Sequence, residues 1–234
     1  MTATEPHEPD RAATATGSTS RGESRQKQII EATIETISEL GFARTTYTRI
    51  AERGGLSSTR LISYHFADKA DLMQAVISDV YASINEFLLE RMAIDPATRP
   101  IQPPTDRPLP QPESAAAELS AYITAVVDYV GTHQARLSAL RSIFAAVHDD
   151  PDNPEAAQAD PRGGVMSYLI GVLERGQATG EFRRFDPLVV AGMIQRPLEA
   201  LPLLLRSRPD LDMAHYAAEL ATAIDCATRQ DGRQ

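Results

Sequence analysis

The feature that most constrains this chain is the helical spacing of its apolar residues, which recurs in one segment after another from residue 26 onward. Ile30, Ile34 and Ile37, for example, repeat every three or four residues, a period that places side chains on one face of an α-helix. Runs of alternating apolar and polar residues bounded by turn signals, the pattern of a half-buried strand, are missing from the sequence. We therefore expect an all-α protein with about nine helices.

Capping and stop signals divide the N-terminal part of the chain into four helices. Gly41 follows the last periodic residue of the first segment, as expected at a helix C-terminus. The Thr45-Thr46 pair offers an N-cap for a second helix, and Ser57 offers one for a third. Asp68 followed by Asp71 is a capping arrangement that opens a long fourth helix. The expected helices are residues 26–40, 47–53, 58–64 and 69–93.

The remainder of the chain is also helical, apart from one proline-rich segment. Residues 95–112 contain seven prolines and no helical pattern, so we expect an extended surface linker there. Helical periodicity then resumes, and one later segment contains Pro197 and Pro202, which are expected to kink or break it. The expected helices are residues 114–132, 135–148, 164–177, 187–206 and 213–229.

Length and composition divide the chain into a tail and two unequal domains. Residues 1–22 lack helical periodicity and cannot bury enough apolar surface to order themselves, so we expect a disordered tail. A chain of 234 residues is long enough to form two modest domains with cores of their own. We expect a three-helix domain over residues 23–70 and a larger helical domain over residues 71–234.

The net charge of −9 is unevenly distributed along the chain. Residues 21–69 carry eight basic and six acidic side chains, a net charge of +2, whereas residues 1–20 carry −2 and residues 70–234 carry −9. A DNA-binding face needs local positive charge to displace counterions, and an acidic remainder only lowers non-specific affinity. The acidic total therefore does not exclude DNA as a partner of the N-terminal domain.

Several other classes of protein find no support in the sequence. No run of about eighteen apolar residues and no signal peptide is present, so we expect a cytoplasmic protein without a membrane partner. Cys226 is the single cysteine, and no Cys or His cluster has metal-ligand spacing, so we expect neither a metal nor a cofactor. The acidic run at residues 149–155 lacks the glycine and terminal glutamate of a calcium loop, and we interpret it as a solvated loop.

The stretch GGLSSTRLISYHFADK, residues 54–69, places polar side chains on a short helix that also needs an apolar face. Three short helices with a glycine-containing turn before the third have the spacing of a helix-turn-helix, whose third helix enters the major groove. Leu56, Leu61 and either Ile62 or Tyr64 can pack inward. A solvated helix end with ordinary caps is the alternative interpretation. The side chains available to face DNA are Ser58, Thr59, Arg60 and Ser63.

Six short elements follow one another in residues 25–75, namely Gly41-Phe42, Thr45-Thr46, Ile50-Ala51, Gly55-Leu56-Ser57, His65-Phe66 and Lys69. With this ordered series, residues 25–75 resemble the N-terminal domain of the tetracycline-repressor (TetR) family of bacterial transcriptional regulators. One departure is that the chain between Ser57 and His65 is a residue longer than the commonest family pattern. The tyrosine often found three residues before the phenylalanine is here Ser63, with Tyr64 beside it.

The resemblance implies roles for individual side chains in DNA binding. Thr46, Tyr64 and Lys69 are expected to contact phosphates, and Arg60 is expected to read guanine with two hydrogen bonds. His65 and Phe66 are expected to serve as scaffold, and a core position is the alternative for Tyr64. The complete expected set of DNA-binding residues is Thr46, Ser57, Ser58, Thr59, Arg60, Ser63, Tyr64 and Lys69.

The resemblance also implies that the C-terminal helices form a small-molecule pocket and a homodimer interface. Residues 187–209 are apolar on more than one face, as expected of a helix buried against both its own domain and a twin. Residues 213–229 either complete a four-helix dimer bundle or pack as intramolecular core. The candidate pocket residues are Tyr122, Tyr129, Phe144, Met166, Tyr168 and Met193, with His133, Arg141 and His148 as polar anchors; core or surface positions are the alternative.

These features predict a ligand-responsive, sequence-specific DNA-binding regulator. Repression is the common mode of the family, so we expect a repressor that a small-molecule effector releases from a palindromic operator. One alternative is a ligand-independent regulator controlled by its abundance or by a protein partner. A second alternative, an enzyme built on the C-terminal helices, lacks a nucleophile elbow, a zinc motif and a phosphate-binding glycine loop.

Overall fold

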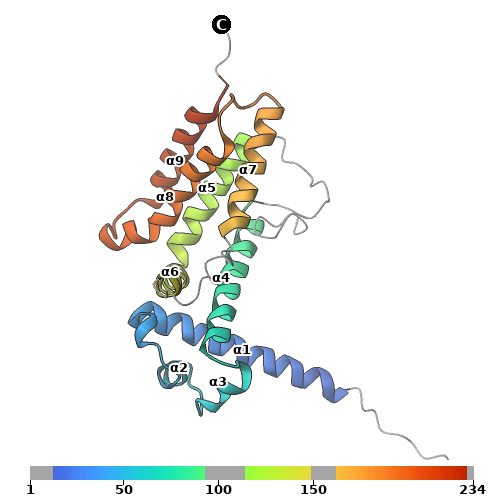
Figure 1. Ribbon diagram of the computed structural model, residues 1–234, viewed down its shortest axis with the longest axis vertical. Coiled ribbons are helices and arrows are strands. Elements are labelled where there is room, and N and C mark those ends of the chain that lie inside the picture. Colours follow the sequence, from blue (N-terminus) through green and yellow to red (C-terminus); the bar gives the residue numbers. More distant parts are fainter. Residues whose placement is uncertain (1–12, 93–113, 149–161, 231–234) are drawn as a thin grey trace, which may run out of the picture. The chain divides into compact units, whose positions relative to one another are not determined.

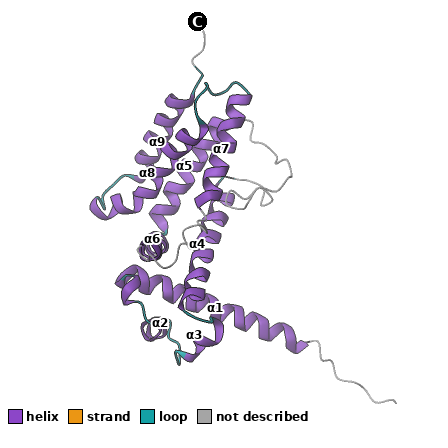
Figure 2. Cartoon of the chain, viewed as in Figure 1, coloured by secondary structure: helices purple, strands orange, loops and turns teal. Residues whose placement is uncertain are grey.

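The computed structural model describes residues 13–92, 114–148 and 162–230 (Figure 1). The described residues form nine α-helices and one short 3-10 helix, and they contain no strand apart from an isolated bridge between Phe182 and Arg229 (Figure 2). The all-α prediction is confirmed. The predicted linker at 95–112 and the acidic run at 149–155 lie outside the described residues.

The elements are α1 (Ala13–Leu40), η1 (Phe42–Arg44), α2 (Tyr47–Arg53), α3 (Arg60–His65), α4 (Lys69–Arg91), α5 (Ala115–Thr132), α6 (Gln134–His148), α7 (Arg162–Ala178), α8 (Pro187–Ser207) and α9 (Met213–Thr228).

The chain divides into two compact units, residues 1–76 and 77–234, and the division falls within α4. Buried side chains of the first unit include Ile34 and Ile62, and those of the second include Ile123 and Leu169. Each unit therefore has an apolar core of its own, because removing such side chains from water is the main favourable contribution to folding.

Helix α1 begins earlier than the sequence predicted. The isoleucines that set its periodicity are buried, and the helix ends at Leu40, where Gly41 has a positive φ of 80°. The helix begins at Ala13, so the prediction of a disordered tail is wrong for residues 13–22, and residues 1–12 lie outside the described part of the chain. Extending an existing helix needs no new nucleus, which allows α1 to continue beyond its apolar stripe.

The predicted capping arrangement at the start of α4 is present. The backbone N–H of Asp71 donates to Asp68 Oδ1 at 2.8 Å, and the N–H of Ala67 donates to Asp71 Oδ2 at 2.9 Å. These bonds satisfy backbone donors around the start of the helix that would otherwise have no protein partner. Helix α4 then continues to Arg91, close to its predicted end.

Helix α5 is the central helix of the second unit. It packs against α7, α8 and α9, and α7 also packs against α8 (Figure 1). Its buried side chains, which include Leu119, Tyr122, Ile123 and Val127, cover more than one face of the helix. This pattern is typical of a helix surrounded by others rather than one lying on a surface.

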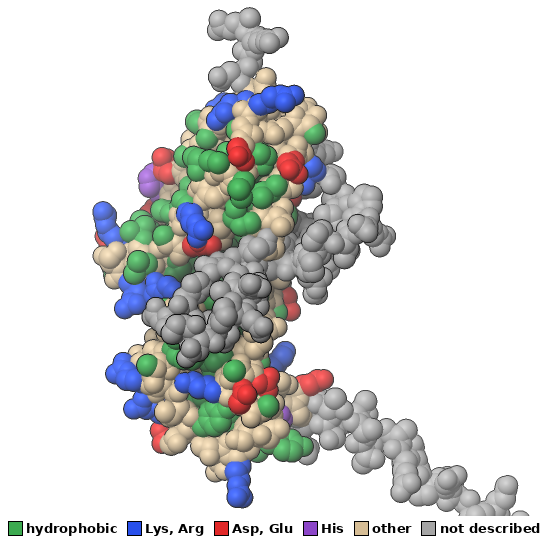
Figure 3. Space-filling view, in the orientation of Figure 1, with side chains coloured by type: hydrophobic (Ala, Val, Ile, Leu, Met, Phe, Trp, Pro, Cys, Tyr) green, Lys and Arg blue, Asp and Glu red, His purple; other side chains and the backbone are tan. Residues whose placement is uncertain are grey.

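Helix α8 is continuous although it contains two prolines. Pro197 and Pro202 both lie inside it, so the prediction is wrong insofar as it expected a broken helix. An internal proline removes one backbone hydrogen bond and crowds the preceding turn. Leu198 and Leu201 are almost completely buried, and this packing offsets the lost bonds. The opposite side of α8 keeps large apolar side chains exposed, and Figure 3 shows apolar groups among charged ones on the surface of this unit; the exposed side chains of α8 are Leu188, Val189, Met193 and Leu203.

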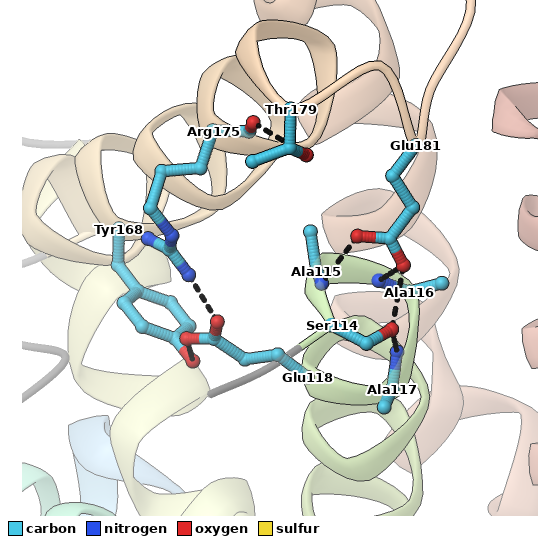
Figure 4. Close-up of polar contacts among 9 residues, drawn as sticks. All are labelled: Ser114, Ala115, Ala116, Ala117, Glu118, Tyr168, Arg175, Thr179 and Glu181. Atoms are coloured by element: carbon cyan, nitrogen blue, oxygen red, sulfur yellow. Dashed lines mark hydrogen bonds and ion pairs between the residues drawn. The ribbon is translucent and has the colours of Figure 1, made fainter. Parts of the chain in front are cut away.

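The loop between α7 and α8 caps the N-terminus of α5 (Figure 4). Ser114 Oγ donates to Glu181 at 2.5 Å, and the N–H groups of Ala115 and Ala116 donate to the same carboxylate at 2.8 and 3.0 Å. Burial would raise the pKa of Glu181, but these hydrogen bonds outweigh it and lower the pKa. The negative charge therefore lies where the helix dipole favours it.

A second acidic side chain of α5, Glu118, is held by α7 (Figure 4). Its side chain is only 6% exposed. Its carboxylate accepts a hydrogen bond from the hydroxyl of Tyr168 at 2.8 Å and forms an ion pair with Arg175. Burial, together with the charge of Glu118, raises the pKa of Tyr168, so the phenol remains a neutral donor. The carboxylate thus has both a counter-ion and a hydrogen-bond donor inside the bundle.

We expect Gly176→Ala to lower the free energy of unfolding by about 1 to 3 kcal/mol, because a buried ring must move to admit the new methyl group. A Cβ at residue 176 would lie 2.1 Å from Cδ2 of Phe182, a side chain that is 3% exposed. Urea denaturation followed by circular dichroism measures the change. Gly171→Ala, also in α7, is the control, because nothing lies within 4 Å of its added Cβ. Equal stability of the two variants would contradict the close packing at Gly176.

Candidate DNA-binding interface and ligand cavity

Helix α2 is fixed to α1 by polar contacts within the first unit. Both terminal nitrogens of Arg53 donate to the carboxylate of Glu39, one of them at 2.7 Å, and Glu35 lies 3.8 Å from the same guanidinium. The hydrogen bond from Arg53 lowers the pKa of Glu39. Gln28 of α1 also donates to the carbonyl of Gly54 at 2.7 Å, just after α2. These contacts set the orientation of α2 and of the turn that follows.

The turn between α2 and α3 requires glycine at two successive positions. Gly55 has a φ of 60°, a left-handed conformation that most side chains disfavour. A Cβ on Gly54 would lie 3.0 Å from Cβ of Ala32 and 3.3 Å from the carbonyl oxygen of Ile50. The two glycines therefore allow the chain to pass close to α1 and turn into α3.

Helix α3 begins later than the sequence predicted. It starts at Arg60, with Thr59 in the N-cap position and no side-chain cap, so the prediction that Ser57 caps the helix is wrong. Ser58 Oγ instead accepts a hydrogen bond from the N–H of Arg60 at 3.1 Å. Three consecutive residues can act as caps, and the contacts of the folded turn decide between them.

One side of α3 is buried and the other is exposed, as expected of a helix that enters the major groove. Ile62 is completely buried, whereas Arg60, Ser63 and Tyr64 are exposed, Tyr64 by 83%. A core position for Tyr64, which the sequence left open, is therefore wrong. Phe66 is buried at 2%, in agreement with its expected scaffold role. Of the other expected DNA-binding residues around this turn, the structure leaves Ser57 and Ser58 exposed and Thr59 half-buried.

The starts of α2 and α4 bring two expected phosphate-binding residues into the same part of the unit. Thr46 is exposed and caps α2, its hydroxyl accepting from the N–H of Arg49 at 3.4 Å. Lys69 opens α4, with Nζ 4.4 Å from the centre of the Phe42 ring. Tyr47, which the sequence analysis did not single out, is the first residue of α2, and burial together with the charges of Asp68 and Asp71 raises its pKa.

Within the second unit, side chains of α4, α5, α6, α7 and α8 line a cavity of about 250 Å³. Three of the candidate pocket residues line it, namely Tyr122, Tyr129 and Phe144. The candidate anchor Arg141 also lines it.

The other candidate pocket residues lie elsewhere. Met166 and Tyr168 pack against the core without lining this cavity, and Met193 is 50% exposed on α8. His133 stacks on the ring of Tyr129 with 4.2 Å between ring centres. The side chains of the third anchor, His148, and its neighbour Val147 lie outside the described ones.

One wall of the cavity carries a chain of hydrogen bonds that the sequence did not reveal. The hydroxyl of Tyr122 donates to Gln195 Oε1 at 3.0 Å, and Gln195 Nε2 donates to Glu199 Oε1 at 3.3 Å. Arg196 donates to the other oxygen of Glu199 at 2.8 Å. Burial and the charge of Glu199 raise the pKa of Tyr122, so its hydroxyl remains protonated. This wall depends on how α5 and α8 meet, which no local pattern specifies.

The outer side of α8 and the groove beside α9 are the surfaces expected to form a dimer. Leu188, Val189 and Leu203 are each about 60% exposed, and a groove of about 580 Å³ between α5 and α9 is lined mainly by small side chains such as Ala218 and Ala221.

Among the described helices, α8 alone is long and apolar enough to cross a membrane, judged by length and composition only. Because a core helix of a soluble protein passes the same test, this finding is weak support for a membrane span.

The first unit matches the family model of bacterial regulatory proteins of the tetR family over residues 29–76. A relative, the HTH-type transcriptional regulator BetI of Escherichia coli O17:K52:H18 (strain UMN026 / ExPEC), is 30% identical over 151 residues, which are 64% of this chain and 69% of the relative. The chain belongs to the TetR family. The protein is accordingly a transcriptional regulator with a helix-turn-helix DNA-binding domain, and the family is not one of enzymes.

Solved structures of TetR-family regulators share the fold at low sequence identity. A TetR family transcription regulator from Marinobacter aquaeolei VT8 has a TM-score of 0.68 at 14% identity, covering 91% of this chain and 100% of that chain. The transcriptional regulator FadR of Bacillus subtilis, solved in complex with stearoyl-CoA, has a TM-score of 0.62 at 18% identity, covering 85% of this chain and 96% of that chain. At these identities the likeness concerns the fold alone.

Proposed function

We propose that this regulator is a ligand-responsive repressor, a homodimer that binds a palindromic operator and releases it when a small molecule occupies the cavity. The observation that carries the proposal is the exposed face of α3, with Arg60, Ser63 and Tyr64 opposite the buried Ile62. Acting on chromosomal DNA, such a repressor works in the cytoplasm.

The candidate DNA-binding side chains divide into two groups by the chemistry they offer. Arg60 has the planar fork of donors that matches guanine in the major groove, and the hydroxyls of the neighbouring serines and Thr59 can bond to base edges or phosphates. Thr46 and Tyr64 offer hydroxyl groups and Lys69 offers a charged ammonium group, and contacts of these groups to phosphates fix the position of a helix without reading sequence. Specificity therefore depends on Arg60 more than on any other side chain of α3.

The apolar surface of α8 supports the homodimer. Large apolar side chains that remain exposed on one helix of a folded unit favour association with a second copy. A twofold dimer presents two α3 helices to two half-sites, which are read when their separation matches the DNA repeat of roughly 34 Å. An effector releases DNA only if it binds better to a dimer with a different separation.

The ligand-responsive part of the proposal is supported by the cavity and by the FadR structure, in which a protein of the same fold holds stearoyl-CoA. A panel of metabolites would first be tested for thermal stabilisation of the full chain, since a specific ligand stabilises the folded state by mass action. Compounds that stabilise the fold are expected to release the protein from its operator.

We expect Val126→Phe, which fills the cavity from α5, to keep operator binding and to lose the response to the effector. Ala145→Phe on α6 is the control, because residue 145 is exposed and does not line the cavity. Fluorescence anisotropy of labelled operator DNA, with and without effector, measures both properties. If Val126→Phe responds like the wild type, the effector binds elsewhere. If no compound stabilises or releases the protein, control by abundance or by a protein partner replaces this proposal.

A further inference from the structure

The size of the cavity favours a small molecule as its ligand. Its volume is about 250 Å³, and its wall is mostly apolar, with aromatic rings from α4, α5 and α6 and aliphatic side chains from α8. A dry apolar cavity of about 150 Å³ already holds benzene. The cavity therefore fits one ring with a short chain, or an aliphatic chain of similar volume.

Charged or amide groups reach this wall from Glu199, Gln195 and Arg141. The first two of these side chains already form a hydrogen bond with each other. Glu199 accepts hydrogen bonds on both oxygens, from Arg196 at 2.8 Å and from Gln195 at 3.3 Å. The carbonyl of Gln195 in turn accepts from Tyr122 at 3.0 Å. The charge of Glu199 is compensated by Arg196, so this end of the cavity does not call for a cation.

Arg141, on α6, is the third of these side chains and has no such compensation among the described residues. Its side chain is half-buried and lines the cavity, and within the described part of the chain it forms no ion pair or hydrogen bond. A guanidinium always carries its charge and has five N–H donors arranged in a plane. Lining an apolar cavity, it is matched best by a carboxylate, which accepts two parallel hydrogen bonds from it.

We propose that the cavity binds a small apolar monocarboxylate, with its carboxylate paired to Arg141 and its ring or chain among the aromatic side chains. This inference rests on the proposed function only in taking the cavity as the effector site. An amine of the same shape is disfavoured, because it would bring a second positive charge to Arg141 while Glu199 already has a partner.

The test compares three probes that share one body and differ in charge: 3-phenylpropionate, 3-phenylpropan-1-ol and 3-phenylpropylamine. Isothermal titration of the full chain is expected to give the carboxylate an affinity at least about tenfold above that of the alcohol, as a charge-assisted hydrogen bond provides. The amine is expected to bind more weakly than the alcohol. Octanoate and octan-1-ol repeat the comparison with a linear body.

Variants of Arg141 connect the preference to this side chain. Arg141→Gln is expected to bring the affinity for the carboxylate down to that for the alcohol, and Arg141→Lys is expected to keep part of the difference. Arg208→Gln, at an exposed site outside the cavity, is the control and is expected to bind like the wild type. Thermal melts of each variant verify folding, and the Arg141→Lys result decides the matter if Arg141→Gln does not fold.

The proposal is overturned if the alcohol or the amine binds as tightly as the carboxylate, if neither carboxylate binds at millimolar concentration, or if Arg141→Gln keeps the preference. Operator release is measured separately by anisotropy. Carboxylate binding that depends on Arg141 but leaves DNA bound would support this ligand class and contradict the gating mechanism. Release of DNA by a neutral or cationic compound in the cavity would support the gating mechanism and contradict this ligand class.

Discussion

Replacing Arg175 with methionine is expected to lower the free energy of unfolding by about 3 kcal/mol, the lower end of the range for breaking a buried ion pair. The loss is large because Glu118, 6% exposed, would keep a negative charge inside the bundle and, among the described residues, only the hydroxyl of Tyr168 as a partner. The value lies at the lower end because the side chain of Arg175 is 30% exposed and water screens part of the charge. Urea denaturation at a fixed protein concentration measures the change.

Two further variants make this test specific. Arg229→Met removes the partner of Asp225 from an exposed pair, so we expect a change of about 0.5 kcal/mol or less. Adding Glu118→Gln to Arg175→Met removes the buried charge, and the double variant is expected to be more stable than Arg175→Met alone. If Arg175→Met were as stable as Arg229→Met, the pair would not contribute to the stability of the bundle.

Replacing Arg60 with alanine is expected to weaken operator binding by about 1 to 3 kcal/mol, roughly fivefold to 150-fold, while affinity for scrambled DNA changes much less. Arg60 is exposed at the first turn of α3, the part of a recognition helix that reaches base edges. Loss of a two-bond contact to one base removes sequence preference rather than general affinity.

Lys69→Ala provides the contrast for Arg60→Ala. A phosphate contact is expected to be lost equally from operator and scrambled DNA, with the slope of log affinity against log salt reduced by about 1. Arg208→Ala removes a charge from an exposed site in the second unit and is expected to change neither affinity. If Arg60→Ala weakened both DNAs equally, Arg60 would contact a phosphate and another residue of α3 would read the base.

The helices were predictable where a local pattern decided them. The bounds of α2 and the end of α1 agree with the sequence prediction. Thr46 caps the start of α2, and Gly54 and Gly41 follow the ends of α2 and α1, so each of these boundaries is set by the backbone nearby. The start of α3 was missed because consecutive hydroxyl residues offered equivalent caps. Helix α8 is continuous because burial of Leu198 and Leu201, contacts made far along the chain, offsets the effect of its prolines.

The candidate sites were predictable to different degrees for the same reason. The outward residues of α3 follow from a short pattern, although only the fold decides that Ile62 rather than Tyr64 is buried. Tyr122, Tyr129 and Phe144 were found by their residue type and helical position. Gln195 and Glu199 were missed because a cavity wall depends on where separate helices meet, and a sequence read locally contains no such information.

The most direct test of the central claim, that α3 reads a specific DNA sequence, is the affinity of the full chain for DNA upstream of its own gene. The measurement compares this DNA with a scrambled fragment of equal length and composition at one physiological salt concentration, since affinity depends steeply on salt. We predict binding at least about a thousandfold tighter to the native fragment, in the range typical of specific over non-specific binding. Equal affinity for the two fragments would contradict operator recognition at this site.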